Sequence, residues 1–373
     1  MGKEKTLRVF DANLIYLMGS LLFFTVGFTV QQRELYTGLI ITQLAVVLLP
    51  PFLYLEIRKM NVRQTMRLNR ITWRQGLLAA LITIFMYPTA VTANLVMLNL
   101  LTRIGTIDIP QIPTASSPLQ YLRLMLIISV LAGVCEEVFF RGFVLRGYEK
   151  LGRRKAVVIS AVLFGVFHYN IYNLAGAIVL GLVFGALVIV TDSLYVGIIG
   201  HMVNNGFAVT LGYAFNLIGD LLPPEEMEIA EAALGDSLLA SLVFFGILAL
   251  AGLVISAYLY RKLKAGSVEM LFSEDKTGQN DIAAEPGKND TDVIAFSETD
   301  PETIPNKGDS GDLENQGSHK IGRTGEQDRD LQNTVNKMPA GKVQWWEYFP
   351  LTGIIPLFLH VMFIQISMLL GRF

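Results

Sequence analysis

The chain has 373 residues, of which 52% are hydrophobic and only 17% are charged. Soluble domains carry about 25% charged residues, so this composition indicates a membrane protein. The net charge of −2, with no basic face outside the loops that flank the membrane, excludes a nucleic-acid-binding protein. Cys135 is the only cysteine, which excludes an internal disulfide and a cysteine-based metal site.

Apolar segments of membrane-spanning length recur along the chain. A bilayer core about 30 Å thick takes roughly 20 mainly apolar residues in a helix. We therefore expect an all-α, polytopic transmembrane helix bundle, with an eight-helix core and an extra C-terminal transmembrane helix. The first helix is expected to be retained, because no signal-peptide cleavage site follows it. The nine expected spans are residues 12–30, 38–55, 76–101, 119–140, 156–171, 173–191, 194–213, 237–260 and 348–370.

Basic residues predict the orientation of these spans, because cytoplasmic loops carry an excess of Lys and Arg. The loops after the second span ("EIRKMNVRQTMRLNRITWRQ"), the fourth ("RGYEKLGRRK") and the eighth ("YRKLK") are all basic. They share a side with Lys3, Lys5 and Arg8 if the N-terminus is cytoplasmic. We therefore expect a multi-pass integral membrane protein with a cytoplasmic N-terminus and its C-terminus on the opposite side.

Three regions are expected along the chain. Residues 1–264 form the membrane-embedded core, and residues 343–373 form the C-terminal transmembrane helix. Between them, residues 265–342 are acidic and rich in Gly, Asn and Asp. Such a segment lacks the apolar content that offsets chain entropy, so we expect a disordered cytoplasmic linker whose partner is left open.

A few ionisable and amide side chains lie inside the apolar spans. Groups at such depth are rare and usually face a bundle interior or a water-filled cavity, so they mark a functional site. They lie on three spans: Glu136, Glu137 and Arg141 on the fourth, His168 on the fifth, and His201, Asn204 and Asn205 on the seventh.

Helical spacing separates the two adjacent glutamates. Residues four apart share one helix face, whereas neighbours diverge by about 100°. Glu137 is therefore expected to pair with Arg141 and to support the site. Glu136 points elsewhere and has no basic partner four residues on, because position 140 is Phe. An unpaired carboxyl at low dielectric suits a general base, so we assign the chemistry to Glu136.

The two histidine spans add further groups to this site. His201 and Asn205 are four apart and present an imidazole and an amide from one face, both able to stabilise an oxyanion. Glu136 and His168 together could orient and deprotonate a water molecule for attack on a peptide carbonyl. Small residues such as Gly197 beside His201 are expected to let the helices approach closely.

Three motifs in this region resemble those of the CAAX protease and bacteriocin-processing (CPBP, or Abi) family. "EEVFFR" matches its EExxxR motif, "FGVFH" its FxxxH motif and "HMVNN" its HxxxN motif, in the family's order across about residues 75–215. This family comprises intramembrane endopeptidases and includes the type II CAAX prenyl proteases. The resemblance implies that Glu136 and His168 activate water, and that His201 and Asn205 form the oxyanion site.

The resulting expectation is an intramembrane endopeptidase that hydrolyses membrane-associated or prenylated (CAAX-type) substrates. One alternative is a non-proteolytic scaffold or immunity factor of the same family, and another is a transporter or proton relay. His201 and Asn205 could instead be interhelical hydrogen-bond partners. No cofactor is favoured. Zinc is the alternative, with Glu136, His168 and His201 as candidate ligands, because the family is often described as metalloproteases and these residue types bind zinc.

Overall fold

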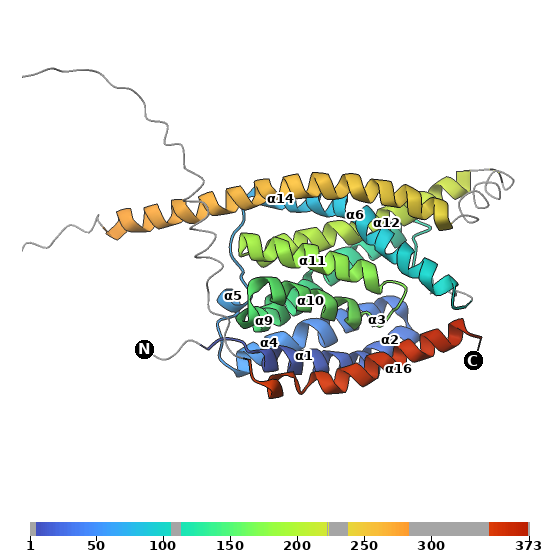
Figure 1. Ribbon diagram of the computed structural model, residues 1–373, viewed down its shortest axis with the longest axis horizontal. Coiled ribbons are helices and arrows are strands. Elements are labelled where there is room, and N and C mark those ends of the chain that lie inside the picture. The colour runs from blue at the N-terminus through green and yellow to red at the C-terminus, as the bar shows by residue number, and fades with distance from the viewer. Residues whose placement is uncertain (1–4, 106–112, 222, 224–237, 283–342, 372–373) are drawn as a thin grey trace, which may run out of the picture. The chain divides into compact units, whose positions relative to one another are not determined.

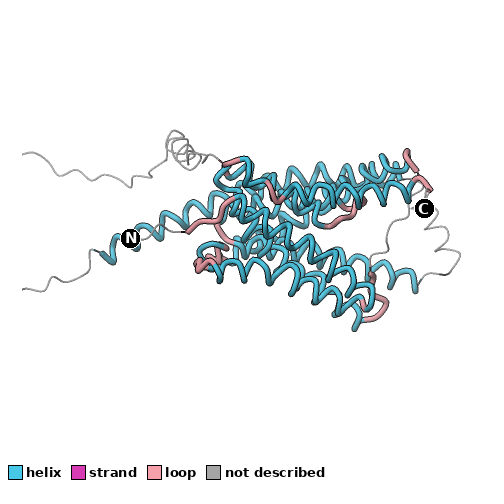
Figure 2. Tube along the Cα trace, turned by 90° about the horizontal axis from the view of Figure 1, so that it is seen from below, coloured by secondary structure: helices cyan, strands magenta, loops and turns pink. Residues whose placement is uncertain are grey.

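The described part of the chain is helical and contains no strand (Figure 2). The computed structural model describes residues 5–105, 113–221, 223, 238–282 and 343–371, and over 268–282 it describes the backbone only. The elements are α1 (Val9–Leu22), η1 (Phe23–Gly27), α2 (Phe28–Arg33), α3 (Leu35–Ile41), η2 (Thr42–Leu48), α4 (Leu49–Ile57), α5 (Val62–Thr65), α6 (Trp73–Thr102), α7 (Pro118–Leu124), η3 (Met125–Leu131), α8 (Ala132–Glu137), η4 (Val138–Val144), α9 (Leu145–Tyr148), η5 (Glu149–Leu151), α10 (Arg153–Phe167), α11 (Leu174–Thr191), α12 (Leu194–Leu221), α14 (Leu238–Ile282), η6 (Trp345–Tyr348) and α16 (Leu351–Leu369).

Membrane-spanning helices dominate this fold, which confirms the predicted all-α polytopic bundle. Within the described ranges, seven helices are long and apolar enough to cross a membrane, where the sequence predicted nine. The other two predicted spans are also helical. The helix from Pro118 to Tyr148 carries five charged side chains, and α10 has only 15 residues, about 22 Å of helix. The seven are Val9–Arg33, Leu35–Ile57, Trp73–Thr102, Leu174–Thr191, Leu194–Leu221, Leu238–Ser267 and Trp345–Leu369.

The helix that runs from Pro118 to Tyr148 supplies the centre of the core. Every residue of its η4 segment is buried, including Phe139, Phe140 and Phe143. These rings pack in one hydrophobic cluster with residues of α1, α10 and α12. Figure 1 shows α10 and α11 between α6 on one side and α1 on the other, and α11 contacts both α6 and α10. This burial puts Glu137 and Arg141 of the same helix inside the bundle.

Helix α14 packs along α6 through small residues. A Cβ at Gly252 would lie 2.0 Å from the carbonyl oxygen of Phe85, so only glycine permits this approach. Ser256 Oγ donates to the carbonyl oxygen of Ile82 at 3.3 Å. The helix continues to Ile282, beyond the predicted span end at residue 260 and into the segment expected to be disordered. The rest of that predicted linker, residues 283–342, lies outside the described residues.

The C-terminal helix α16, predicted as an extra transmembrane helix, is part of the same compact unit as the N-terminal core. Ile354 is 3% exposed and belongs to the main hydrophobic cluster. Just before the helix, the carbonyl oxygen of Glu347 accepts a hydrogen bond from Asn13 Nδ2 at 2.9 Å. Figure 1 shows α16 running alongside α1, which it contacts.

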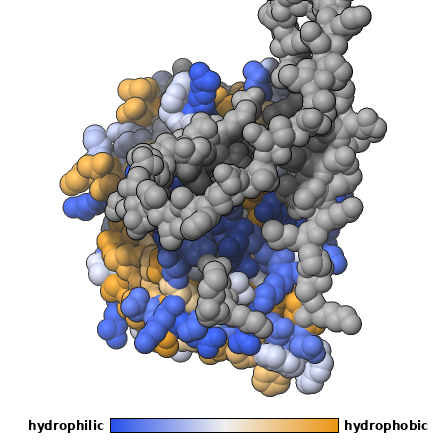
Figure 3. All heavy atoms as spheres, turned by 90° about the vertical axis from the view of Figure 1, so that its left-hand side faces the viewer, coloured by the Kyte–Doolittle hydropathy of each residue, from blue (hydrophilic) through white to orange (hydrophobic). Residues whose placement is uncertain are grey.

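The predicted cytoplasmic loops meet at one end of the bundle. Lys5 Nζ donates to the carbonyl oxygen of Arg58 at 3.0 Å. The buried Arg67 side chain pairs with Asp192 through Nε and with Glu149 through Nη2. Figure 3 shows hydrophilic residues gathered on this end face. The loops after the second, fourth and sixth predicted spans are thus joined, while the assignment of this end to the cytoplasm stays a prediction.

Candidate active site

The ion pair predicted from the four-residue spacing is present at the centre of the bundle. Arg141 Nη1 donates to Glu137 Oε1 at 2.6 Å, and neither side chain is exposed. The guanidinium also lies over the rings of Phe164 (4.4 Å) and Phe184 (5.3 Å), and Nη2 donates to the carbonyl oxygen of Gly181 at 3.3 Å. Charge, hydrogen bonds and ring faces together offset the loss of hydration of this buried arginine.

Glu137 has a second partner, His201 of α12. His201 Nδ1 lies 2.9 Å from Glu137 Oε1. A carboxylate only accepts hydrogen bonds, so Nδ1 carries the proton and donates it. The other ring nitrogen, Nε2, then faces Glu136, with 3.9 Å between Nε2 and Oε2. The ring is also stacked on Phe184, with centroids 5.1 Å apart and planes 19° apart, so its orientation is fixed on both sides.

Helix α12 approaches Glu137 closely because Gly197 lies at their contact. A Cβ at Gly197 would be 2.9 Å from Glu137 Oε2 and 2.8 Å from a methyl group of Val188. Any larger side chain would push α12 away and lengthen the hydrogen bond from His201. The role predicted for a small residue beside His201 is therefore present in the structure.

Glu136 occupies a different environment from Glu137. Its side chain is 16% exposed, whereas that of Glu137 is fully buried. Gln43 Nε2, from η2 in the second span, donates to Glu136 Oε1 at 2.8 Å. The remaining oxygen of Glu136 faces His201. Gln43 was not among the predicted site residues, because the sequence shows it only as one amide side chain within the apolar segment 38–55.

His168 lies at the C-terminal end of α10, next to this cluster. Its Nδ1 donates to the carbonyl oxygen of Phe164 at 2.8 Å, since a carbonyl oxygen only accepts. Nε2 is therefore left as the acceptor nitrogen of the neutral ring. The Phe164 ring makes edge contacts with both imidazoles, at 4.8 Å to His168 and 5.7 Å to His201. Within the described residues, the two histidines are thus neighbours across one phenylalanine, with no hydrogen bond between His168 and Glu136.

His168 and Glu136 lie at similar depth in the bundle, as the lengths of their helices show. Arg141 is buried, and its helix continues to Tyr148. Glu136 is therefore about 18 Å along the helix from that end, at 1.5 Å per residue. His168 follows α10, whose 15 residues begin at Arg153 and extend about 22 Å from the same end. The two side chains are at similar depth.

Asn205, the fourth predicted catalytic residue, makes hydrogen bonds between helices. Its Nδ2 donates to the carbonyl oxygen of Ile128 at 2.9 Å, and its Oδ1 accepts from Asn204 Nδ2 at 3.0 Å. The alternative of an interhelical hydrogen bond is thus realised. The predicted oxyanion role of Asn205 rests on the second hydrogen of its amide nitrogen.

The described residues do not fit the zinc alternative. Among them, no three His, Cys, Asp or Glu side chains form a group that could hold a metal ion. The Nδ1 atoms of His201 and His168 are hydrogen-bonded within the protein, which leaves the Nε2 atoms as the ring nitrogens that could meet a ligand. We therefore derive no step of a reaction through a metal.

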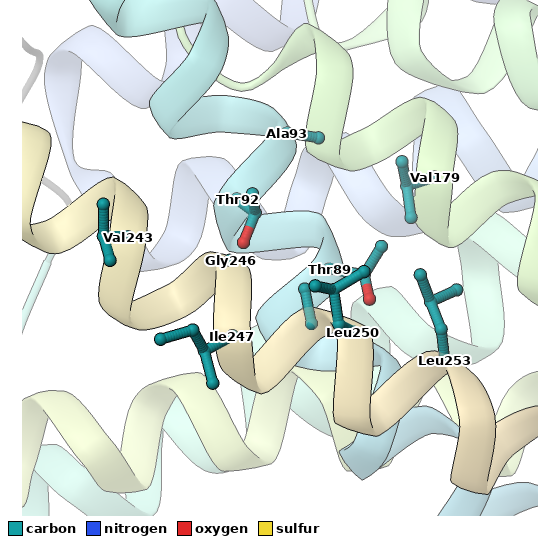
Figure 4. Close-up of a pocket in the computed structure, with 10 residues that line it drawn as sticks. Thr89, Thr92, Ala93, Val179, Val243, Gly246, Ile247, Leu250 and Leu253 are labelled. Carbon is teal, nitrogen blue, oxygen red and sulfur yellow. The ribbon is translucent and has the colours of Figure 1, made fainter.

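A separate apolar pocket of about 540 Å³ lies between α6, α11 and α14. Figure 4 shows Thr89 and Thr92 of α6 and Val179 of α11 facing a row of aliphatic side chains on α14. Its lining includes none of the six predicted site residues. It is therefore distinct from the polar cluster around Glu136.

Comparisons with known proteins point to the same segment of the chain. Residues 118–207 match a family model described as type II CAAX prenyl endopeptidase Rce1-like. A Bacillus subtilis (strain 168) protein named "Putative membrane peptidase YdiL" is 33% identical over 95 residues, which are 25% of this chain and 39% of that protein. The chain thus spans about two fifths of the length of this curated relative. No solved structure matches the chain.

Proposed function

We propose that the chain is an intramembrane endopeptidase, because residues 118–207 match the family model described as type II CAAX prenyl endopeptidase Rce1-like. It hydrolyses peptide bonds of membrane-associated or prenylated (CAAX-type) substrates with water activated by Glu136. His201 stabilises the oxyanion that forms, and Glu137 and Arg141 hold His201 in place.

The observation that carries this proposal is the order Glu137, His201, Glu136 across two helices. Glu137 Oε1 fixes His201 Nδ1 at 2.9 Å, and His201 Nε2 lies 3.9 Å from Glu136 Oε2. A carboxylate that orients one ring nitrogen while the other faces the reacting groups is the logic of hydrolytic triads. The 3.9 Å separation is too long for a direct hydrogen bond and leaves room for a reacting oxygen beside both groups.

The proposed reaction follows from these positions. Glu136 accepts a proton from water, and the water oxygen attacks the carbonyl carbon of the scissile peptide. The carbonyl oxygen becomes an oxyanion, to which His201 in its doubly protonated form donates a hydrogen bond from Nε2. The C–N bond then breaks, and Glu136 returns its proton to the leaving amine. The carboxylates of Glu136 and Glu137 balance the charges of His201 and Arg141.

The other two predicted site residues have supporting positions in this mechanism. The Nε2 of His168 is the free acceptor of its ring and can share a hydrogen of the attacking water with Glu136. The second amide hydrogen of Asn205, one turn beyond His201, can reach the oxyanion. Neither residue is hydrogen-bonded to Glu136 among the described contacts. We therefore expect substitution of either side chain to lower kcat less than substitution of Glu136 does.

The test is cleavage by the purified full-length protein in lipid nanodiscs, with a farnesylated CAAX-type peptide and its unmodified counterpart as probes. Glu136→Gln keeps the size of the side chain but removes the base, so it should lower kcat by about 10³-fold, within the usual contribution of general-base catalysis. The matched control is Glu56→Gln, because Glu56 is an exposed glutamate outside the site.

Two results would overturn the proposal. One is a Glu136→Gln protein that cleaves as fast as the wild type. The other is a wild-type protein that cleaves neither peptide, although it is monodisperse in nanodiscs and its thermal unfolding transition shows that it is folded. Faster cleavage of the farnesylated peptide supports the prenylated substrate class, whereas equal rates favour membrane-associated peptides in general.

A further inference from the structure

The loop that follows His168 is held by a side chain of the C-terminal helix. Gln365 of α16 accepts a hydrogen bond at Oε1 from the backbone N–H of Ile171, at 2.9 Å. Its Nε2 donates to the carbonyl oxygen of Tyr169 at 2.8 Å. One amide thus satisfies a donor and an acceptor of the loop, within three residues of the imidazole.

The backbone of this loop needs external support. Tyr169 has φ of 47°, in the left-handed region that residues with a Cβ rarely adopt. Surrounding contacts must hold such a conformation. On one side, the Tyr169 ring is stacked on Phe23 at 5.7 Å and meets the edge of Phe24 at 4.5 Å. On the other side, the support comes from Gln365.

Apolar contacts reinforce this attachment. Ile171 is 9% exposed and packs in one cluster with Leu101 of α6 and with Met362 and Leu369 of α16. A Cβ at Gly105, just beyond α6, would lie 1.9 Å from the carbonyl oxygen of Leu369. The end of α16 is therefore packed tightly against the chain on both sides of the His168 loop.

We propose that α16 completes the active site, with Gln365 as a positioning residue that fixes the backbone around His168 and thereby the direction of its imidazole. His168 is the last residue before the left-handed turn, and Phe164 contacts its ring through a hydrogen bond to Nδ1 and an edge contact. Rotation of the loop would change the direction in which its Nε2 points. This inference rests on the proposed peptidase function, and it assigns a role to a helix outside residues 118–207.

The decisive variant is Gln365→Met, which keeps the length and volume of the side chain and removes both hydrogen bonds. Gln365→Glu keeps the acceptor for the Ile171 N–H and loses the donor to Tyr169. The control is His360→Ala, because His360 is a polar, exposed residue of the same helix. Each full-length protein is compared with the wild type in nanodiscs.

Two readouts are used. Hydrogen–deuterium exchange of the peptide that covers residues 168–173 reports the loop directly and requires no peptidase activity. Cleavage of the farnesylated CAAX-type peptide gives kcat and KM separately. We expect Gln365→Met to speed exchange in the loop and to lower kcat about tenfold with KM unchanged, as for other residues that orient a catalytic group. Gln365→Glu should be intermediate, and His360→Ala should match the wild type.

Each outcome decides the inference. Unchanged exchange in Gln365→Met overturns the proposed clamp, whether or not the chain is a peptidase. Faster exchange with unchanged kcat overturns the positioning role. A rise in KM equal to the loss of kcat/KM does so too, because it indicates a binding or folding effect. If the wild type cleaves nothing, the proposed function and this positioning role fall together, while exchange still shows whether Gln365 holds the loop.

Discussion

His201 is oriented by Glu137 and not by Glu136: its Nδ1 donates to Glu137 Oε1 at 2.9 Å, whereas its Nε2 is 3.9 Å from Glu136 Oε2. The same oxygen of Glu137 accepts from Arg141 at 2.6 Å. One buried carboxylate therefore neutralises a guanidinium and fixes an imidazole. This double role of Glu137 is separate from the role proposed for Glu136.

The first prediction concerns stability. Glu137→Gln leaves the Arg141 charge buried without its partner, so the free energy of unfolding should fall by about 3–5 kcal/mol, the usual loss when one member of a buried pair is removed. Thermal unfolding of the purified protein in nanodiscs measures this change. Cleavage should fall as well, because the amide no longer attracts a protonated His201.

The comparison for Glu137→Gln is Glu56→Gln, which removes an exposed carboxylate at the end of α4. This control should unfold at the wild-type temperature. Equal unfolding temperatures for the two variants would show that the Glu137–Arg141 pair contributes no net stability.

A second prediction concerns Gln43, which donates to Glu136 Oε1 at 2.8 Å. Gln43→Leu keeps a side chain of similar size but frees the Glu136 carboxyl to rotate away from His201. A hydrogen bond to a charged group contributes about 1.5–3 kcal/mol, so kcat should fall by about 10- to 100-fold. Steady-state cleavage of the farnesylated peptide gives this value, with little change expected in KM.

Gln31→Leu is the matched control for Gln43→Leu. Gln31 lies in the same helical hairpin and donates to Thr42 Oγ1 at 2.8 Å, away from Glu136. The Gln31→Leu variant loses one hydrogen bond between neutral groups and should keep the wild-type kcat. Equal losses of kcat in both variants would trace the effect to the hairpin fold and remove Gln43 from the site.

Local spacing predicted the parts of the site that lie within one helix. The pairing of Glu137 with Arg141 follows because residues four apart share one face of a helix, and the structure contains this pair. The spacing could not predict the partners that Glu136 and Glu137 have on other helices. His201 is 64 residues from Glu137, Gln43 is 93 from Glu136, and no periodic pattern connects such positions.

The helices of the fold could be predicted from the sequence, whereas the contacts between them could not. The length of the apolar segments located nine helices, since hydropathy depends on composition alone. Burial of individual side chains depends on how these helices pack. Arg141 is fully buried one residue beyond the predicted end of the fourth span, because Glu137 and aromatic rings surround it. The contribution of α16 was missed because Gln365 meets its backbone partners 194 and 196 residues earlier in the chain.

The third prediction is that activity requires no bound metal. The described His, Cys, Asp and Glu side chains form no three-residue group that could hold a metal ion. Dialysis against EDTA and treatment with 1,10-phenanthroline should therefore leave kcat unchanged. Elemental analysis of the active protein should give far less than one zinc per chain. Loss of activity with the chelators, restored by added zinc, would instead make Glu136, His168 and His201 ligands and require them to move together.

The fourth prediction concerns orientation in the membrane. The end of the bundle with the Arg67 ion pairs should face the cytoplasm, because the loops that meet there are basic. Cys135 is fully buried, so Cys135→Ala gives a cysteine-free background with the smallest change in packing. In that background, a membrane-impermeant maleimide applied to intact cells should label Ile104→Cys and Leu370→Cys. Arg63→Cys should react only after the membrane is opened.

The side chains at all three labelling positions are exposed. Two of the positions lie at one end of the bundle, and the third lies at the other end. Ile104 follows α6 and Leu370 follows α16, next to each other through the contact of Gly105 with Leu369. They must therefore react from the same side, which is an internal check on the experiment. Arg63 of α5 is at the opposite end, four residues from the ion-paired Arg67. Labelling of Arg63→Cys in intact cells, with Ile104→Cys protected, would reverse the predicted orientation.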